Sequence, residues 1–428
     1  MAGGRLFLGN FTNLKCKECG RTFDLGAASV CEYCFGSLDV DYNYERITKL
    51  VSKKRIRKLN PDIWRYRDFL PLDGAGFVDL SPGFTPLQRA HRLAAELGIK
   101  NLYIKNETVN PTFSCKDRMV AVAVSRAVEL GFDTVACAST GNLAHSLAAH
   151  GARAGLKSYI FIPHDAEPVK LTATRVYDPV LIAVKGTTAR INSLCNEVMS
   201  RVHWGFVNIN LRPYYAEGAK TIAYEIAEQL DWTAPDHVVV PVASGTTLTK
   251  IQKGFKELVM TELLRSQHVA IHGAQAEGCA PIVNAFLRGS ELIQPVIPAT
   301  VAKSLSIGDP ADGIYAVRAM RETGGQATAV SDKEIIDGVK LLARTEGIFA
   351  EPAGGAAIAA LGRLAKARAF KASDTVVVVV TGLGMKTPET VQDKLKPPRP
   401  ITPSIEELEA FFTEMKRAAH SAGTPELS

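Results

Sequence analysis

The chain of 428 residues has no long hydrophobic run, and apolar stretches such as Val376 to Val380 are far too short to cross a bilayer. Its start, MAGGRLFLGNFTNLKCKECG, lacks a charged segment followed by an apolar one, so no secretory signal is expected. Internal repeats are missing, and no GxGxxG follows an early strand, which disfavours an oxidoreductase. The sequence therefore predicts a cytoplasmic protein with no membrane partner.

The composition is that of an ordinary soluble globular protein, with 46% hydrophobic and 22% charged residues. The length predicts two or three domains. Fifty basic and 44 acidic residues give a net charge of +6, which suits an anionic small molecule as well as a nucleic acid. Charge alone therefore does not separate these two kinds of ligand.

Four of the eight cysteines lie close to the start of the chain, as Cys16-x-x-Cys19 and Cys31-x-x-Cys34. Two knuckles at this spacing place four thiolates around one tetrahedral zinc ion, although a redox pair or unligated thiols would share the pattern. Four thiolates leave zinc no open position, so we expect a structural site remote from any chemistry. We expect most of the remaining cysteines to be small buried hydrophobes: Cys115, Cys137, Cys195 and Cys279.

A basic, tyrosine-rich stretch follows, YNYERITKLVSKKRIRKLNPDIWRY. Beside a zinc ribbon it raises the possibility of a nucleic-acid-binding protein. Its aromatic residues are not interleaved along a face on which bases could stack. We therefore favour a solvated helix that leads into the main body, with no nucleic-acid partner.

From about residue 100, short apolar runs alternate with amphipathic segments of helical period. Runs such as TVACAS, KSYIFIP, HVVVPVAS and TVVVVVTG lack polar alternation, as strands buried on both faces of a parallel sheet do. This order predicts an α/β protein with mostly parallel sheets. Near residue 400, KPPRPITPS reads as a linker to a terminal helix with Ser404 as its N-cap and Glu407 three residues later.

One lysine stands at the expected start of a helix, in NPTFSCKDRM over residues 110–119. Helix N-termini favour negative charge, so Lys116 is either an ordinary solvated residue or an amine with a depressed pKa. A depressed pKa would make it a nucleophile or a base.

Three expected strands end in small polar loops, where ligands sit in open parallel sheets. The loop Ala138 to Asn142 offers hydroxyls, an amide and helix N–H groups to a carboxylate or a phenolate oxygen. Residues Ala243, Ser244, Gly245, Thr246 and Thr247 are small enough for backbone N–H groups to close around a phosphate. Thr381 places a hydroxyl after a buried strand. Each loop alone is equally consistent with a tight turn.

Together the loops and the lysine offer an anion cradle, an aldehyde-reactive amine, an amide for a ring oxygen and a hydroxyl for a ring nitrogen. Pyridoxal 5'-phosphate requires this set of groups. The hydroxyls that remain in the first loop could hold the carboxylate of an amino acid.

In this order the motifs resemble those of the fold-type-II pyridoxal-phosphate enzymes, and of the threonine synthases among them. The resemblance rests on the four-cysteine ribbon, NPTFSCKDR, ACASTGNLAHSLAAHGARAG, FVNINLRPYYAEG, VASGTTLTKIQKGF, SLSIGDPADGIYAVRAM, EGIFAEPAGGAA and VTGLGMK. It implies a fold like that of the tryptophan synthase β subunit, with two open α/β domains and the cofactor between them. We predict a ribbon over residues 1–45, a small domain over 111–212, and a large domain over 46–110 and 213–428.

The resemblance also implies roles for single residues. Lys116 is expected to bind the cofactor covalently, Asn142 its ring hydroxyl, residues 243–247 its phosphate and Thr381 its pyridine nitrogen. For the substrate, the expected ligands are Ser114, Ser139, Thr140, Arg212 and Lys105.

Two departures from the family pattern stand out. The family commonly has Phe where this chain has Cys115, and the smaller side chain could loosen packing under the cofactor or serve redox regulation. The FVNINLRPYYAEG segment also differs from better-known members, in which an arginine near this point contacts the substrate phosphate; Arg212 is the candidate here.

The implied function is a lyase that converts O-phospho-L-homoserine and water to L-threonine and phosphate, and a homodimer is expected. An alternative keeps the cofactor and changes the substrate, as in a β-replacement enzyme such as cysteate synthase or a specialised-metabolism relative. A third hypothesis, from another class, is a zinc-ribbon nucleic-acid-binding protein.

Overall fold

The computed structural model describes residues 9–74, 76–164, 168–186, 188–265, 268–395 and 397–421. The chain divides into two compact units, Met1–Thr387 and Pro388–Ser428. In the part of the chain that the structure describes, no helix is both long and apolar enough to span a membrane.

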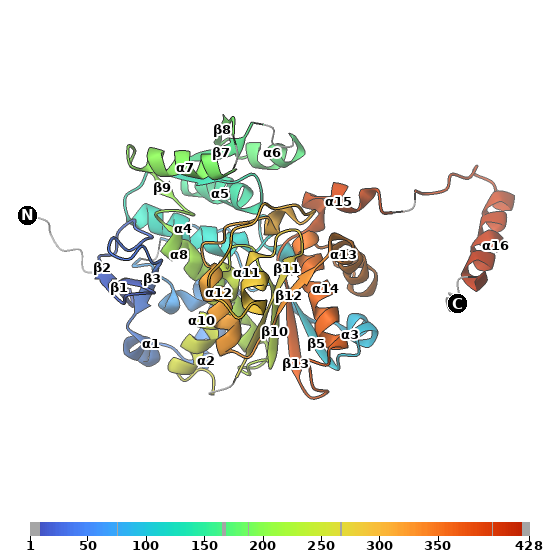
Figure 1. The fold of residues 1–428 in the computed structure, drawn as a ribbon, viewed down its shortest axis with the longest axis horizontal. Coiled ribbons are helices and arrows are strands. Elements are labelled where there is room, and N and C mark those ends of the chain that lie inside the picture. Colours follow the sequence, from blue (N-terminus) through green and yellow to red (C-terminus); the bar gives the residue numbers. More distant parts are fainter. Residues whose placement is uncertain are drawn as a thin grey trace, which may run out of the picture. The chain divides into compact units, whose positions relative to one another are not determined.

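The largest sheet of the first unit has six strands in the order β12-β11-β10-β13-β5-β4 (Figure 1). All neighbours pair in parallel except β4 and β5, which are antiparallel. The strands are β4 (Leu87–Arg89), β5 (Asn101–Asn106), β10 (His237–Pro241), β11 (Ala270–Ala276), β12 (Ala327–Val330) and β13 (Thr375–Val380).

Strand β13 shows why an unbroken valine run forms the middle of this sheet. Val377 and Val379 point into one hydrophobic cluster. Val376, Val378 and Val380 point into another on the opposite face. β-Branched residues that are buried on both faces are typical of a parallel sheet covered by helices on each side. The predicted α/β class is therefore confirmed.

Two groups of helices cover these faces (Figure 1). One group is α9 (Thr221–Gln229), α10 (Thr246–Met260), α11 (Pro281–Leu287) and α12 (Gly313–Glu322). The other is α3 (His91–Leu97), α13 (Asp332–Glu346) and α14 (Pro352–Lys366).

A second, smaller sheet has four parallel strands in the order β8-β7-β6-β9. They are β6 (Thr134–Ala138), β7 (Lys157–Pro163), β8 (Val180–Val184) and β9 (Gly205–Phe206). Its helices are α4 (Lys116–Glu129), α5 (Asn142–Ala154), α6 (Pro168–Arg175) and α7 (Thr188–Met199). All of them lie within the residues predicted to form the small domain.

The N-terminal segment forms a third, antiparallel sheet of β1 (Phe11–Cys16), β2 (Thr22–Phe23) and β3 (Leu38–Tyr42). The basic stretch that follows is less solvated than predicted. It contains α1 (Tyr44–Leu50), α2 (Lys53–Arg57) and the 3₁₀ segment η1 (Ile63–Phe69), and it buries residues from each. It packs into the body because its apolar side chains recur among the basic ones.

The remaining elements of the first unit are short: α8 (Arg212–Glu217), η2 (Glu107–Val109), η3 (Gly218–Lys220), η4 (Lys303–Leu305) and η5 (Gly384–Lys386). The second unit contains α15 (Glu389–Gln392) and α16 (Ile405–Ser421). Ser404 caps α16 as predicted, because its Oγ accepts the backbone N–H of Glu407 at 3.2 Å. The prediction counted this unit with the large domain, whereas it forms a compact unit of its own.

Candidate active site

Lys116 is the first residue of α4, and the loop before it is joined to the carboxyl end of β13. The backbone N–H of Cys115 donates to the carbonyl of Thr381 at 2.9 Å, and that of Leu383 donates to Phe113 at 3.1 Å. Phe113 takes a positive φ of 62°, which lets the chain turn sharply before the helix. Two segments far apart in sequence, the lysine loop and the end of β13, are thereby held together.

Asp117 fixes the first turn of this helix. Its carboxylate accepts from Thr112 N at 2.7 Å and Thr112 Oγ1 at 2.6 Å, as expected for an acid at a helix N-terminus. It also accepts from Ser146 Oγ on α5 at 2.6 Å. The same aspartate therefore aligns the lysine helix with the helix that carries Asn142.

The pKa of Lys116 is raised, not depressed. Burial lowers the pKa of this amine, but the Tyr215 hydroxyl, Cys115 and Glu351 together outweigh burial and bring the pKa above its ordinary value. The alternative of a depressed pKa for this lysine does not hold for the protein's own residues, because Tyr215, Cys115 and Glu351 together favour the protonated amine.

Glu351 is the acid that sequence reasoning missed, and it joins two predicted site residues. Its carboxylate accepts from Asn142 Nδ2 at 2.9 Å and from Thr381 Oγ1 at 3.2 Å. Lys386 Nζ in turn donates to Asn142 Oδ1 at 2.9 Å. A usable signal was present, since an acid in the small, apolar run AEPAGG has little reason to be there for packing.

The close approach at this point requires a glycine. A Cβ on Gly382 would lie 2.7 Å from Glu351 Oε1, closer than packed atoms come. Gly382 also pairs with Ser114 in an isolated β-bridge. Ser114 is fully buried, and its Oγ has no hydrogen-bond partner among the described residues.

The loop of residues 243–247 connects β10 to the N-terminus of α10. Gly245 has φ of 93°, and a Cβ there would lie 2.7 Å from the carbonyl oxygen of Asp312. Thr246 Oγ1 lies 3.0 Å from Ser244 Oγ and donates to Asp312 Oδ2 at 2.6 Å. Ala243 and Thr247, both half-buried, complete the loop. Backbone N–H groups at a helix N-terminus and small hydroxyl residues suit a phosphate.

Ser139 and Thr140 follow β6 and precede α5, on the loop that ends in Asn142. Both are half-buried. The Ser139 Oγ accepts the backbone N–H of Gly141 at 3.2 Å, so the loop already orders one of its hydroxyls. These two residues therefore lie on the same helix entrance as Asn142.

The structure leaves Lys105 no free donor with which to bind a ligand. Its side chain is fully buried and donates to Thr85 O at 2.7 Å, Glu225 Oε2 at 2.6 Å and Gln229 Oε1 at 2.8 Å. An ammonium group has three donors, and all three are used here. The prediction of Lys105 as a substrate ligand took a lysine near the end of a strand for a site residue, while two of its three partners, Glu225 and Gln229, lie on α9.

Arg212 lies beside the 243–247 loop. Its Nη2 is 2.6 Å from Asp312 Oδ2, the same oxygen that accepts from Thr246. The guanidinium is therefore placed at the loop with the features of an anion cradle. Its N-terminal position on the short helix α8 follows from Pro213, which suits the first turn of a helix.

The four N-terminal cysteines converge as the spacing predicted. Their sulfur atoms all lie within 4.8 Å of one another, with Cys16 and Cys34 Sγ 3.4 Å apart and Cys19 and Cys31 Sγ 3.7 Å apart. Such a set suits one tetrahedral metal ion. The cluster is not remote from the site, however: Lys17, inside the first knuckle, lies 3.4 Å from Asp312.

The other four cysteines are buried, as predicted. Burial raises the pKa of the Cys115 thiol to about 11. A thiol with so high a pKa stays protonated and reacts slowly with oxidants, which disfavours redox regulation through Cys115.

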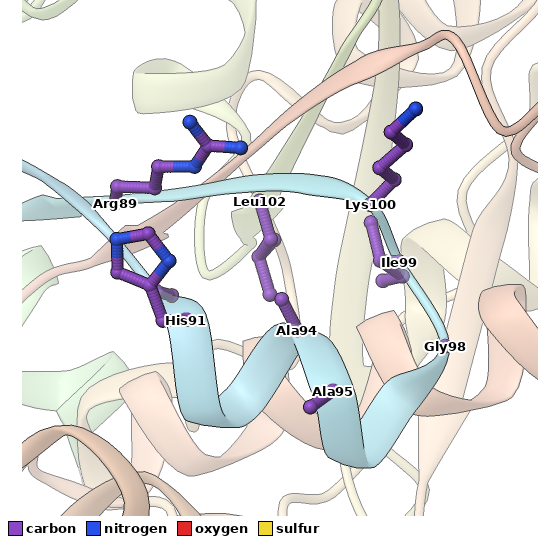
Figure 2. A pocket seen from close by; sticks show the side chains of 9 residues that line it. Arg89, His91, Ala94, Ala95, Gly98, Ile99, Lys100 and Leu102 are labelled. Atoms are coloured by element: carbon purple, nitrogen blue, oxygen red, sulfur yellow. The ribbon is translucent and has the colours of Figure 1, made fainter.

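A pocket of about 350 Å³ lies elsewhere on the large sheet. Figure 2 shows Arg89, His91 and Lys100 around it, next to helix α3. Lys100 and Leu102 stand at the amino end of β5, whereas Lys116 and Thr381 lie near the carboxyl ends of the strands. Ligands of open parallel sheets bind at the carboxyl ends, so this pocket is not the candidate active site.

The fold and the site define a class of protein. The family model described as "Pyridoxal-phosphate dependent enzyme" matches residues 78–382. Among solved structures, the processed form of threonine deaminase isoform 2 from Solanum lycopersicum has a TM-score of 0.62 at 22% identity, covering 72% of this chain and 82% of that chain. Maize serine racemase has a TM-score of 0.61 at 20% identity, covering 72% and 91%. At these identities the likeness shows the fold alone.

Two curated relatives indicate which family of pyridoxal-phosphate dependent enzymes this chain belongs to. "Threonine synthase" of Methanocaldococcus jannaschii is 39% identical over 404 residues, which cover 94% of this chain and 99% of that protein. "Threonine synthase" of Methanosarcina acetivorans is 38% identical over 408 residues, covering 94% and 100%. The chain therefore belongs to the threonine synthases, within the pyridoxal-phosphate dependent enzymes. The predicted fold type and family are confirmed.

Proposed function

We propose that this protein converts O-phospho-L-homoserine and water to L-threonine and phosphate. The observation that carries the proposal is the meeting of Lys116, Asn142 and Thr381 around Glu351 at the carboxyl ends of the strands. The relatives named threonine synthase, matched along almost their whole length, support the choice of reaction.

The residues present fit pyridoxal 5'-phosphate. Gly245 supplies a loop that a Cβ would close, Ser114 Oγ is a buried hydroxyl without a partner among the described residues, and Lys116 is a half-buried amine. Lys116 would hold the aldehyde, Asn142 the ring hydroxyl, Thr381 the ring nitrogen and residues 243–247 the phosphate. When bound, the cofactor supplies an electron sink that makes the Cα and Cβ protons of an amino acid removable.

Lys116 is the proton carrier in this proposal. Its amine lies in a buried site, and Glu351 stabilises its charged form, so the protonated amine is available as an acid after it has acted as a base. Over one turnover protons leave Cα and Cβ, phosphate leaves Cγ, a proton is added at Cγ, the oxygen of water adds at Cβ, and a proton returns to Cα. Atoms balance, because one water enters and one phosphate leaves.

The substrate carries a carboxylate and a phosphate, and the site offers separate donors for them. We propose that Ser139, Thr140 and the N–H groups of their loop bind the carboxylate. Arg212 is proposed for the substrate phosphate, because a guanidinium binds such a group with charge-assisted hydrogen bonds. The hydroxyl of Ser114 is a further donor toward the substrate, supported by its lack of a partner.

Several coarser features are proposals of the same kind. We propose a structural zinc ion on Cys16, Cys19, Cys31 and Cys34, supported by the distances between their sulfur atoms. We also propose a cytoplasmic homodimer, no nucleic-acid partner, and the division into residues 1–45, 111–212, and 46–110 with the part of 213–428 that precedes the separate unit Pro388–Ser428. The three separate sheets support that division.

The test is to incubate the purified protein and cofactor with O-phospho-L-homoserine and to measure phosphate and threonine together. Equal amounts of both products are expected. A parallel reaction uses O-phosphoserine, the substrate expected for a β-replacement enzyme such as cysteate synthase. Reaction with phosphoserine alone would reject the proposed reaction and leave the cofactor assignment intact.

A further inference from the structure

The first cysteine knuckle lies against the residue that supports the phosphate loop. Lys17, between Cys16 and Cys19, places its Nζ 3.4 Å from Asp312 Oδ1 and 4.2 Å from the centre of the Tyr315 ring. Its side chain is only 18% exposed. The charge of this lysine therefore interacts with Asp312 and Tyr315 more than with solvent.

Asp312 connects this lysine to the loop. One carboxylate oxygen faces Lys17, and the other accepts from Thr246 Oγ1 at 2.6 Å. Its backbone N–H donates to Ser244 O at 2.9 Å, and its carbonyl limits the space at Gly245. Asp312 thus contacts three residues of the 243–247 loop: Ser244, Gly245 and Thr246.

The negative charge of Asp312 lies beside the proposed phosphate site, where it would repel a phosphate group. It is buried, and although burial raises the pKa of its carboxyl, Arg212 and Lys17 outweigh burial and hold the pKa below its ordinary value. A carboxylate beside a phosphate dianion disfavours phosphate binding unless cations neutralise it. Among the residues that the structure describes, Arg212 and Lys17 are the cations within 4 Å of the carboxylate of Asp312.

The knuckle itself is fixed on two sides. The Lys17 N–H donates to Ser37 O at 3.0 Å, and a Cβ on Gly36 would lie 2.9 Å from Cys16 Sγ, so the two knuckles are in close contact. Next to Lys17, Glu18 Oε1 accepts from Arg318 of α12 at 2.9 Å. The four-cysteine cluster therefore determines where the Lys17 amine stands.

We propose that Lys17 is a positioning residue for the cofactor phosphate: it neutralises and orients Asp312, which in turn holds Thr246 and the phosphate loop. The inference rests on the proposed function, because it takes residues 243–247 as the phosphate site. It gives the four-cysteine ribbon a part in cofactor binding, whereas its sequence predicted only a structural one.

The experiment compares pyridoxal 5'-phosphate with pyridoxal, which has the same ring and no phosphate. Both dissociation constants are measured on the full chain stripped of cofactor, for the wild type, Lys17→Met, Lys17→Arg and Lys15→Met. Lys15 is an exposed lysine two residues away and provides a matched control for the loss of one charge. Metal content and thermal unfolding verify that each variant keeps its ribbon and its fold.

Lys17→Met is expected to lower the preference for the phosphorylated ligand about tenfold, with pyridoxal binding unchanged, because only the phosphate responds to the charge of Asp312. Lys17→Arg should restore most of the preference, and Lys15→Met should keep all of it. A wild-type preference in Lys17→Met, or an equal loss of both affinities, overturns the inference. If Lys17→Met does not fold, Lys17→Gln is judged by the same two outcomes.

Gly245→Val separates this inference from the proposed function. Loss of the preference in Gly245→Val but not in Lys17→Met would reject the role of Lys17 and leave the phosphate loop in place. An unchanged preference in Gly245→Val would instead reject residues 243–247 as the phosphate site, and with them the ground for both proposals.

Discussion

Two lysines, the fully buried Lys105 and the half-buried Lys116, differ in how their amines are paired. Lys105 fills its three donors with Thr85 O, Glu225 and Gln229 at 2.6 to 2.8 Å. In the described part of the chain, Lys116 has the Tyr215 hydroxyl and the sulfur of Met119 at 4.0 Å as its contacts. Lys105 is fully buried and Lys116 is half-buried, so both the exposure and the partners of the amine distinguish a lysine of the scaffold from a reactive one.

Their neighbourhoods differ in the same way. Lys105 belongs to a closed network in which Arg118 donates to Glu107 Oε2 at 2.6 Å and pairs with Glu225, and all four side chains are fully buried. The network near Lys116 opens to solvent, since Asn142 is half-buried. A buried network whose donors and acceptors are all hydrogen-bonded stabilises and specifies a fold. A network with unused donors or acceptors can still bind a ligand.

The largest effect is expected for Lys116→Ala. Turnover should fall by on the order of 10³-fold or more, because both the cofactor link and the proton carrier are removed. The free energy of unfolding of the cofactor-free protein should change by about 1 kcal/mol or less, since the Glu351 carboxylate keeps its hydrogen bonds from Asn142 and Thr381. Threonine release and urea unfolding measure the two quantities; near-normal turnover would remove Lys116 from the chemistry.

Lys105→Met should have the opposite effects on the two quantities: stability should fall and turnover should change little. It leaves the buried Glu225 carboxylate with Arg118 as its one cationic partner among the described residues and should lower the free energy of unfolding by about 3 kcal/mol. At a temperature where the variant is folded, turnover should stay near that of the wild type. The double variant with Glu225→Gln is the control, and it should recover part of the loss. Normal stability with lost turnover would place Lys105 in the site after all.

Acid should destabilise the same network. Burial raises the pKa of Glu225, but Arg118 and Lys105 outweigh burial and lower the pKa from 4.5 to about 2. A group whose pKa is lower in the folded state stabilises the fold above its unfolded pKa and loses this contribution as the pH falls. Stability should therefore decline between about pH 4.5 and pH 2. Urea unfolding at several pH values should show a shallower decline for Glu225→Gln; an identical slope would refute the assignment.

A smaller effect is expected for Glu351→Gln. Removing this carboxylate takes away one of the charges that raise the pKa of Lys116, so the amine should lose its proton at lower pH. At neutral pH pyridoxal 5'-phosphate should then bind faster, by about tenfold or less. The rate is followed by stopped-flow absorbance against pH, with Glu96→Gln, an exposed acid, as the control. A profile that does not move would exclude Glu351 as the counter-charge.

Much of the site could be predicted because its residues follow strands directly. Lys116, Asn142, Thr381 and the 243–247 loop each stand where a strand or helix boundary is visible in the sequence, and parallel strands bring such ends to one edge. The valine run of β13 predicted the buried sheet for the same reason: period and burial are local properties.

The errors concern partners far away in sequence. Nothing near Lys105 indicates that its charge is met by Glu225, and nothing near Lys17 indicates Asp312. Glu351 and Asp312 were missed because each acts through residues of another element, and pairing of this kind depends on tertiary packing. A polar residue can be placed at a strand end from sequence, but its charge state cannot.

The most direct test of the account is to identify the lysine that binds the cofactor. The purified protein with pyridoxal 5'-phosphate is reduced with borohydride, digested, and mapped by mass spectrometry for the pyridoxyl-phosphate group. The account predicts that the group is on Lys116, in the peptide that contains Ser114 and Cys115. Labelling of Lys105 or Lys386 instead, with Lys116 unmodified, would contradict it.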